Sequence, residues 1–280
     1  MVGGSGIYAI EGLRKARWRT VESPFGEPSD ALLHGELDGQ ELVFLPRHGR
    51  GHRIGPSEIN YRANIDALKR VGVTDIVSLS AVGSLREDLS PGTFVIVDQF
   101  IDKTVARQRS FFGAGVVAHV SLAQPVCNGL GASLASAATG IDLIRSGTYV
   151  AVEGPQFSTR AESDGYRDGR GDVIGMTNMP EARLAREAEI CYATVAMVTD
   201  YDCWHPGHDA VSVENVVAVL SKNAEKARTL IRRAARPIVV REDHCACRTA
   251  LDSAVITPPD ARDRDLVARL DAVAGRVLRN

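Results

Sequence analysis

The chain has 280 residues and a mass of 30.1 kDa, enough to bury the core of one large α/β domain or of two small ones. The 33 Lys and Arg residues against 35 Asp and Glu residues give a net charge of -2, spread without basic blocks, so a nucleic-acid partner is not expected. With 44% hydrophobic and 24% charged residues, the composition is globular and excludes disorder over most of the chain.

The sequence shows no signal for a membrane or for export. No stretch reaches the roughly 18 consecutive apolar residues of a membrane span, and Gly3 and Gly4 stand where a signal sequence has basic and then apolar residues. The five cysteines form no regular framework, as is usual where thiols stay reduced. We therefore expect a cytoplasmic protein without a membrane partner that folds without disulfides.

Short apolar runs rich in β-branched residues alternate with helical patterns along the chain. The runs predict buried strands at residues 41–46, 75–80, 93–98, 147–152 and 192–199. The alternation predicts the α/β class, with a central mixed, partly parallel sheet flanked by helices on both faces. No internal repeat or linker interrupts it, so residues 1–280 are expected to form a single domain.

Three segments of the chain have helical periodicity. The clearest is 57–71, where Ser57 is the candidate N-cap and Gly72 ends the pattern. The other two helices are predicted at 180–189 and 213–235.

Two stretches between these elements are predicted as loops, 128–140 because its residues are small and 164–172 because it is polar and rich in glycine. Near the end of the chain, apolar residues at helical spacing predict one amphipathic helix over 260–278. We expect residues 240–280 to form a C-terminal extension that ends in this packed helix.

The residues that follow the predicted strands are the informative ones, because ligands of open α/β sheets bind beyond the carboxyl ends of the strands. Arg47, His48 and further basic residues follow the first of these strands and are able to hold an anion. The small-residue turn 80–84 follows the second and offers a hydroxyl and backbone N–H groups. The glycine-rich loop 3–6 with Ser5 offers the same groups. Together they predict one anion site.

A pair of carboxylates follows the last of these strands. Asp200 and Asp202 point to the same side of an extended chain, so both face one space. Such a pair suits a metal site, an acid/base pair with one carboxyl raised in pKa, or recognition of the donors of a nitrogen heterocycle. The spacing alone leaves open a fourth interpretation, a solvated cap of the next helix.

Metal ligation is not expected from the spacing of histidines and cysteines. Cys203 has histidines nearby in sequence, but Cys245 and Cys247 have a C-x-C spacing that is unusual for structural zinc sites. We interpret the C-x-C cysteines as an incidental or redox-sensitive surface pair. The isolated His34 and His119 are interpreted from spacing as structural residues.

Nine blocks of sequence, taken in order, carry a resemblance to a known family. They are GGSG at 3–6, TVESPFGEPSD at 20–30, RHGRGH at 47–52, NYRANI at 60–65, SAVGSLRE at 80–87, DQFIDKT at 98–104, VEGPQFSTRAES at 152–163, MTNMPEARLAREAEICYA at 176–193 and TDYDCW at 199–204. From Gly3 to about Ala235 the chain resembles the S-methyl-5'-thioadenosine phosphorylases of the trimeric purine nucleoside phosphorylase family. The resemblance implies the nucleoside phosphorylase fold and a pentosyltransferase.

The reaction implied by the resemblance is phosphorolysis, in which phosphate attacks C1′ of methylthioadenosine to give adenine and 5-methylthioribose 1-phosphate. No metal or organic cofactor is implied, since inorganic phosphate is the co-substrate. The resemblance assigns the phosphate to Ser5, Arg47, His48, Ser80, the backbone N–H of Ala81, and Thr177.

The resemblance also assigns the residues that bind the nucleoside. Asp200, protonated, hydrogen-bonds N7 of the purine, and Asp202 accepts a hydrogen bond from the 6-amino group, which favours adenine over a 6-oxopurine. Met176 contacts the ribose, and Phe157 contacts the base. The methylthio group contacts Val213, Val216 and Val217. His119 is lent by a neighbouring subunit of a homotrimer.

Two alternatives stay open. Within the class, the chain is a methylthioinosine or general purine nucleoside phosphorylase. Outside it, the chain is an inactive nucleoside-binding protein, because only Met1 and Val2 precede the glycine loop where the resemblance implies a full strand. A hydrolytic nucleosidase is disfavoured, since it has no use for a cationic phosphate site.

Overall fold

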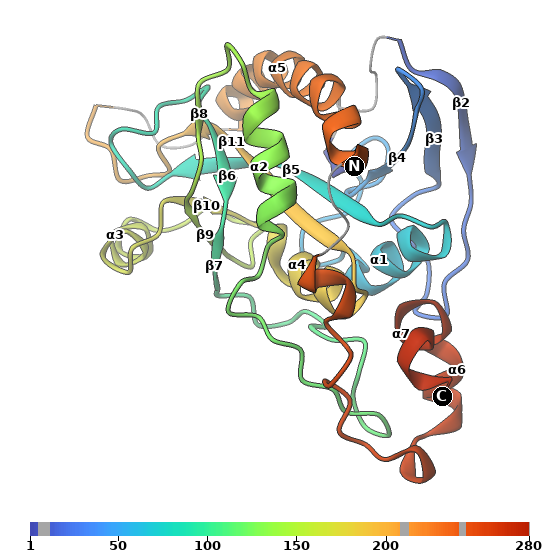
Figure 1. Cartoon of the computed structure of the whole chain (residues 1–280). Helices are drawn as coiled ribbons and strands as arrows, with labels where there is room; N and C mark the ends of the chain where they lie inside the picture. The colour runs from blue at the N-terminus through green and yellow to red at the C-terminus, as the bar shows by residue number, and fades with distance from the viewer. Residues whose placement is uncertain (5–11, 208–212, 241–244, 280) are drawn as a thin grey trace.

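Residues 1–4, 12–207, 213–240 and 245–279 are described by the computed structural model of the chain. They form a mixed sheet of 11 strands with helices on both faces, as predicted (Figure 1). Within these residues, no helix is both long enough and apolar enough to cross a bilayer. The strands are β1 (Val2–Gly3), β2 (Arg14–Arg19), β3 (Leu32–Leu37), β4 (Gln40–Pro46), β5 (Asp75–Ser84), β6 (Phe94–Val97), β7 (Gln99–Asp102), β8 (Leu143–Ile144), β9 (Thr148–Ala151), β10 (Val173–Gly175) and β11 (Cys191–Asp200).

The helices of the described chain lie on both sides of this sheet. They are α1 (Tyr61–Arg70), α2 (Asn128–Ala137), α3 (Arg160–Asp168), α4 (Asn178–Glu187), α5 (Val213–Val240), α6 (Arg264–Arg269) and α7 (Asp271–Leu278), with short 3₁₀ turns η1 (Ala246–Thr249) and η2 (Pro259–Ala261).

The parallel pair of β5 and β11 forms the centre of the sheet. Their register runs from Cys191 opposite Asp75 to Val198 opposite Val82, so both strands have their carboxyl ends at the same edge. The short β1 lies parallel between β4 and β5, while β6 and β10 pair antiparallel with β11 and β5. The first strand is thus present as two residues that complete the ladder between β4 and β5.

Side chains of β11 alternate between two hydrophobic cores because successive residues of a strand point to opposite faces. Val195 and Met197 belong to the core that contains α2 and α5. Ala196 and Val198 belong to the core that contains α1, α4 and α7. The strand is buried on both faces, which explains why its sequence is continuously apolar rather than alternating.

The start of α1 differs from the prediction. Asn60, not Ser57, is the N-cap, and its side chain accepts a hydrogen bond from the N–H of Ala63 at 3.1 Å. Ser57 donates instead to the backbone carbonyl of Glu153 at 3.0 Å. The end of the helix is as predicted, since Gly72 follows it with a φ of +83°.

Two stretches that were predicted as loops are largely helical: 128–137 is α2, and 164–168 is the second half of α3, while 169–172 is not helical, as predicted. Helix α2 is capped by Cys127, whose Sγ accepts a hydrogen bond from the N–H of Leu130 at 3.4 Å. Helix α3 begins with a capping box between Thr159 and Glu162. Only Ser163 of α3 is buried, so that helix has no apolar stripe by which its sequence would reveal it.

Two further predictions of element bounds are wrong. The predicted turn at 80–84 is the second half of β5, because Gly83 and Ser84 pair with β10. The single helix predicted over 260–278 is broken into α6 and α7 at Leu270, which is fully buried against the core.

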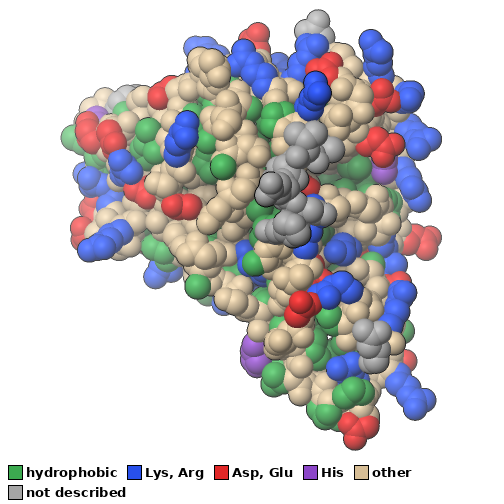
Figure 2. Space-filling model, viewed as in Figure 1, with side chains coloured by type: hydrophobic (Ala, Val, Ile, Leu, Met, Phe, Trp, Pro, Cys, Tyr) green, Lys and Arg blue, Asp and Glu red, His purple; other side chains and the backbone are tan. Residues whose placement is uncertain are grey.

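Residues 105–126 leave the sheet and run beside the tail segment 250–263, and together they form a projection that we term the arm (Figure 1). Backbone N–H groups of His119 and Ile256 donate to the carbonyls of Ala254 and Val117 at 2.9 and 3.0 Å. Figure 2 shows a lobe below the main body, to which the arm and the helices α6 and α7 contribute, with apolar side chains at its surface.

We predict that Leu270→Ala lowers the free energy of unfolding by ~2–5 kcal/mol, because it leaves a cavity where α6 and α7 join the core. Urea unfolding followed by circular dichroism measures the change. Arg264→Ala, at an exposed position of α6, is the matched control and leaves the midpoint nearly unchanged. An equally small effect of Leu270→Ala would show that the end of the chain does not pack on the core.

Candidate functional site

The carboxyl ends of β5 and β11 bring together residues that are far apart in sequence. Asp200 pairs with Gly83 across a β-bulge that interrupts the register after Val198. Thr177, which precedes α4, reaches the same place, and its Oγ1 lies 3.4 Å from Oγ of Ser80. The edge of the sheet predicted from the strand ends is therefore where the candidate site lies.

Arg47 follows β4 and is 1% exposed. Its Nε and Nη2 donate to the carboxylate of Glu181 at 2.7 and 2.9 Å. Nη2 also donates to Oγ of Ser78, and Nη1 donates to the carbonyl of Leu79 at 3.2 Å. These bonds use four of the five N–H donors of the guanidinium and leave one on Nη1. Burial opposes the charge of Arg47, but Glu181 more than compensates, so the pKa of Arg47 is raised.

A buried polar network surrounds this ion pair. Oγ of Ser78 and Oη of Tyr192 each donate to Glu181 at 2.9 Å. Nδ2 of Asn178 donates to Ser78 and to Tyr192, both at 3.0 Å. Arg47 is therefore half of a neutral, fully enclosed pair rather than a free cation.

His48, the second predicted basic ligand, is buried and uncharged. Its Nδ1 lies 2.9 Å from the carbonyl oxygen of Ile54, so we assign the proton to Nδ1 and leave Nε2 as an acceptor. Burial first, and the charge of Arg47 second, lower the pKa of His48 to about 4. The more distant Arg50 pairs with Asp30 at 2.8 Å. Of the basic residues predicted to hold an anion, Arg47 is thus paired with Glu181, His48 has a lowered pKa, and Arg50 is paired with Asp30.

Three hydroxyl groups meet beside the network. Oγ of Ser80 lies 3.2 Å from Oη of Tyr149, as well as close to Thr177. Thr177 is the N-cap residue of α4, yet its side chain makes no capping hydrogen bond. Its hydroxyl is thus not used in capping, and the extended backbone of Met179 (φ -117°, ψ 131°) separates Thr177 from the regular turns of α4. Ala81 follows in β5, and the predicted ligand Ser5 lies outside the described residues.

Asp200 ends β11 and is partly buried. Its Oδ2 accepts from Oγ1 of Thr199 at 2.7 Å, and its Oδ1 accepts from the N–H of Asp202 at 2.8 Å. Burial raises the pKa of Asp200, and the charge of Asp202 adds to the rise, while the two hydrogen bonds oppose it. The carboxyl therefore keeps its proton to higher pH than an exposed aspartate does.

Asp202 is 6% exposed and has a φ of +50°, in the left-handed region that few aspartates adopt. Burial raises the pKa of Asp202 against opposing effects of the Ser163 and Ser158 hydroxyls. Its Oδ2 nevertheless completes no hydrogen bond of good geometry within the described residues. The site thus holds a buried carboxylate whose Oδ2 has, among the described residues, only the Ser163 and Ser158 hydroxyls and the backbone of Cys203 nearby.

Gly83 makes room for both aspartates. A Cβ on Gly83 would lie 2.8 Å from Oδ1 of Asp200 and 3.3 Å from Cβ of Asp202. The two aspartates therefore lie at one place, as their spacing predicts, but the bulge and the left-handed backbone of Asp202 put them there rather than a regular extended strand.

The other predicted substrate residues lie on flanking segments. The side chain of Met176, which follows β10, lies against Gly154. The remaining ones are Phe157, Val213 and Val217, which are exposed in this single chain, Val216, which is half-buried at the start of α5, and His119, which is exposed on the arm.

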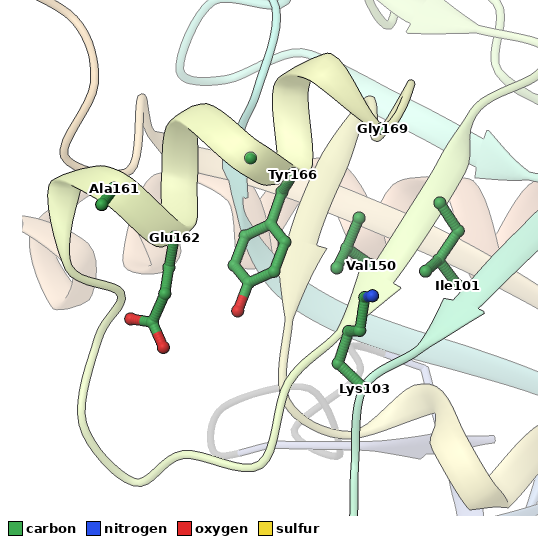
Figure 3. Close-up of a pocket in the computed structure, with 8 residues that line it drawn as sticks. Ile101, Lys103, Val150, Ala161, Glu162, Tyr166 and Gly169 are labelled. Atoms are coloured by element: carbon green, nitrogen blue, oxygen red, sulfur yellow. The ribbon is translucent and has the colours of Figure 1, made fainter.

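A pocket of about 340 Å³ lies beside the site, between α3 and the strands β7 and β9 (Figure 3). Lys103, Glu162 and Tyr166 border it, but none of the predicted site residues lines it. Glu162 is also engaged as the capping residue of α3. Two of the residues that line the pocket, Glu162 and Tyr166, are close enough to Asp202 to interact with its charge, so the pocket adjoins the candidate site.

Comparisons with known proteins place the chain in a family. Residues 1–236 match the family model described as the phosphorylase superfamily. The chain belongs to the phosphorylase superfamily. It is 59% identical over 283 residues to the S-methyl-5'-thioadenosine phosphorylase of Bradyrhizobium diazoefficiens, and the alignment covers 100% of this chain and 97% of the relative. It is 61% identical over 284 residues to the S-methyl-5'-thioadenosine phosphorylase of Rhodospirillum rubrum, and that alignment covers 99% of this chain and 96% of the relative.

Solved structures agree with this membership. A methylthioadenosine phosphorylase from an antarctic soil metagenomic library superimposes with a TM-score of 0.91 at 50% identity, over 97% of this chain and 96% of that one. An adenosine/methylthioadenosine phosphorylase variant from Schistosoma mansoni, in complex with methylthioadenosine, superimposes with a TM-score of 0.80 at 38% identity. The match covers 86% of this chain and 91% of that one. The nucleoside phosphorylase fold expected from the sequence blocks is thus confirmed for this phosphorylase-superfamily member.

Sequence reasoning missed the buried partners of the site. Glu181 lies within a block that resembles the family, but nothing local marks it as the counterion of Arg47, which is 134 residues away. Arg107, also buried, donates to the carbonyls of Met176 and Met179 at 2.6 Å each and pairs with Glu153 at 3.1 Å. Arg107 therefore fixes the segment that leads from β10 into α4.

We predict that Glu181→Gln lowers the free energy of unfolding by about 3–5 kcal/mol, because it leaves the buried charge of Arg47 without its counterion. Glu36→Gln, which breaks an exposed pair with Lys15, is the control and has little effect. Urea unfolding at pH 7 compares the two variants. If Glu181→Gln is as mild as Glu36→Gln, the ion pair does not organise the site.

Proposed function

We propose that the chain catalyses the phosphorolysis of S-methyl-5'-thioadenosine to adenine and 5-methylthioribose 1-phosphate. The observation that carries the proposal is the placement of a hydroxyl-lined anion site beside two buried aspartates at the ends of β5 and β11. Proteins named for this activity match the chain over nearly all of their own length. On this proposal the chain is a pentosyltransferase of purine and methionine salvage.

The reaction needs no covalent intermediate on the enzyme. An oxygen of phosphate forms a bond to C1′ while the bond from C1′ to N9 breaks, and its electron pair moves onto the purine. The protein has to place phosphate beside C1′, stabilise the charge that arrives on the purine, and exclude water. No redox cofactor takes part, since no electron is transferred to or from the enzyme.

The phosphate site uses neutral donors as much as charge. The hydroxyls of Ser80 and Thr177 and the N–H of Ala81 donate to the phosphate oxygens. The one N–H of Arg47 that the buried network leaves unused, on Nη1, also donates to the phosphate in this proposal. His48 takes a role different from that of a cation: its free Nε2 accepts the hydrogen bond of the phosphate hydroxyl. Ser5 completes the set as implied by the resemblance.

Asp200 supplies the proton that the leaving purine needs. Its raised pKa keeps the carboxyl protonated to higher pH, so it donates to N7 as negative charge develops there. As the pH rises through that pKa, the proton is lost and the turnover number falls. Asp202 accepts from the 6-amino group through the carboxylate oxygen that has no partner of good geometry in the described chain.

The apolar side chains around the aspartates complete the nucleoside site. Met176 contacts the ribose and Phe157 covers the base. The methylthio group lies against Val213, Val216 and Val217. An apolar pocket discriminates only weakly, by about 100-fold, against a hydroxyl in place of an apolar group. Adenosine is therefore expected to be a slow substrate.

The active unit is a cytoplasmic homotrimer in this proposal, with His119 lent to the neighbouring subunit. The arm supports it, since it projects from the body, exposes His119, and carries Ile256 with 63% of its surface exposed (Figures 1 and 2). The projection itself is what supports the proposal, since it carries the exposed His119 away from the body of its own chain.

The deciding experiment measures adenine release from methylthioadenosine by the purified protein with and without phosphate. Phosphate-dependent release establishes phosphorolysis, and phosphate-independent release identifies a nucleosidase. Methylthioinosine and adenosine as competing substrates separate a general purine nucleoside phosphorylase. Binding of methylthioadenosine without turnover identifies an inactive nucleoside-binding protein.

We predict that Asp202→Asn lowers kcat/KM for methylthioadenosine by roughly 100-fold, because the acceptor for the 6-amino group is weakened. The same variant improves the ratio of methylthioinosine to methylthioadenosine turnover, since an asparagine amide donates to a 6-oxo group. Steady-state kinetics with both nucleosides measures the ratio. Asp200→Asn is the matched control: it lowers both activities and leaves the ratio unchanged. An unchanged ratio in Asp202→Asn would remove Asp202 from base recognition.

We predict that two inactive variants restore each other. When His119→Ala and Asp200→Asn chains are mixed and reassembled, about a quarter of the sites receive both intact residues if His119 comes from the neighbour. Activity measured before and after mixing gives the answer, with light scattering to count subunits. If the activity of the mixture equals the mean of the two variants, His119 does not act across a subunit boundary.

A further inference from the structure

Four of the five cysteines of the chain meet at the end of β11 opposite to the candidate site. The Sγ atoms of Cys127, Cys191, Cys245 and Cys247 all lie within 4.8 Å of one another. They come from the N-cap of α2, the first residue of β11, and the turn η1 with the residue before it. The sequence showed only the C-x-C pair, because the other two cysteines are distant along the chain.

The separations between the sulfurs fit a single tetrahedral ion. Zinc–thiolate bonds of about 2.3 Å place the four sulfurs of a tetrahedral site about 3.8 Å apart. The Sγ atoms of Cys127 and Cys245 are 3.5 Å apart, and all the other pairs lie within 4.8 Å. A disulfide bond needs about 2.05 Å between its sulfurs, and all four thiols are free. We propose that these four cysteines, termed the thiol cluster, bind one zinc ion.

The surroundings of the thiol cluster suit bound thiolates. Three of the four cysteines are buried and Cys245 is half-buried, so water has little access. The N–H of Leu130 donates to Sγ of Cys127 at the start of α2, where the helix dipole favours a negative ligand. Donors of this kind orient and stabilise metal-bound sulfurs.

The ligand set points to zinc in a structural role. Four thiolates in tetrahedral arrangement select zinc or iron–sulfur centres, and sulfurs this close together enclose one ion rather than a cluster with its own sulfides. A site closed by four protein ligands has no open position for substrate. It also lies a whole strand away from Asp200, at about 30 Å for the ten residues of β11.

The ion would fasten the C-terminal tail to the body of the protein. Past η1, the tail continues to Leu251, whose N–H donates to Glu189 at 2.9 Å, and to Ala254, which accepts from His119. Zinc therefore holds the base of the tail segment that forms one side of the arm. The sequence interpretation of Cys245 and Cys247 as an incidental or redox-sensitive surface pair is wrong in its location, because Cys247 is buried and Cys245 is half-buried.

The test is the zinc content of the full chain purified under reducing conditions without chelator, measured by elemental mass spectrometry. We expect one zinc per chain, and at least a tenfold loss of zinc affinity in Cys245→Ser, measured by competition with a chromophoric chelator. Cys203→Ser is the matched control, since Cys203 is the one cysteine outside the thiol cluster, and it keeps its zinc. Cobalt loaded in place of zinc gives the visible absorption of a tetrahedral thiolate site, and zinc added to the stripped protein raises its Tm.

Three results would overturn the proposal. The first is a chain that contains no zinc and takes up none after stripping and incubation with zinc and a reductant. The second is equal retention of zinc by Cys245→Ser and Cys203→Ser. The third is an intact mass that shows disulfides in the freshly purified protein with no metal bound. If Cys245→Ser is insoluble, the zinc content and zinc titration of the unaltered chain decide the question.

Discussion

The ion pair between Arg47 and Glu181 is the interaction on which the geometry of the site depends. Taking two charges out of water costs several kcal/mol per ion and is tolerated only where hydrogen bonds fill the remaining donors and acceptors. Ser78, Tyr192 and Asn178 fill them here. Because Arg47 follows β4 and Glu181 lies in the first turn of α4, the pair holds that helix against the sheet. Thr177 is thereby placed beside Ser80, so the positions of the two hydroxyls proposed to bind phosphate depend on the buried ion pair.

The fold was predictable from sequence where burial alone decides the pattern. The continuous apolar run of β11 predicts a strand covered on both faces, and the periodicity of α1 predicts its buried face. Helix α3 was not predictable, because a helix with one buried residue has no stripe, and its capping box is a signal only in hindsight. The basic strand β2 was missed for the same reason, since all six of its residues are exposed.

The candidate site was predictable as a set of residue types and not as a geometry. The strand-end rule places Ser80 and Asp200 at one edge of the sheet. The rule does not give the charge or the hydrogen-bond partners of each group. The counterion of Arg47 is 134 residues away, and the carbonyl that binds His48 is brought close by a turn of the following loop. The same limit applies to Asp202, whose approach to Asp200 depends on a bulge, a left-handed backbone and a glycine on the neighbouring strand.

Strand β11 runs from the thiol cluster to the candidate substrate site, and these two places have opposite chemical requirements. At its carboxyl end, Asp202 keeps an acceptor without a partner of good geometry in the described chain, which is what a substrate site needs. At its amino end, Cys191 joins three other thiols in a closed set, which is what a structural ion needs. The tail held at that end supports the arm through His119 and Ala254, and the arm projects from its own subunit. On the two proposals, a zinc ion at the thiol cluster and a homotrimer completed by His119, loss of the ion would affect mainly the neighbour's site, while Asp200 and Asp202 of the same chain stay fixed by the core.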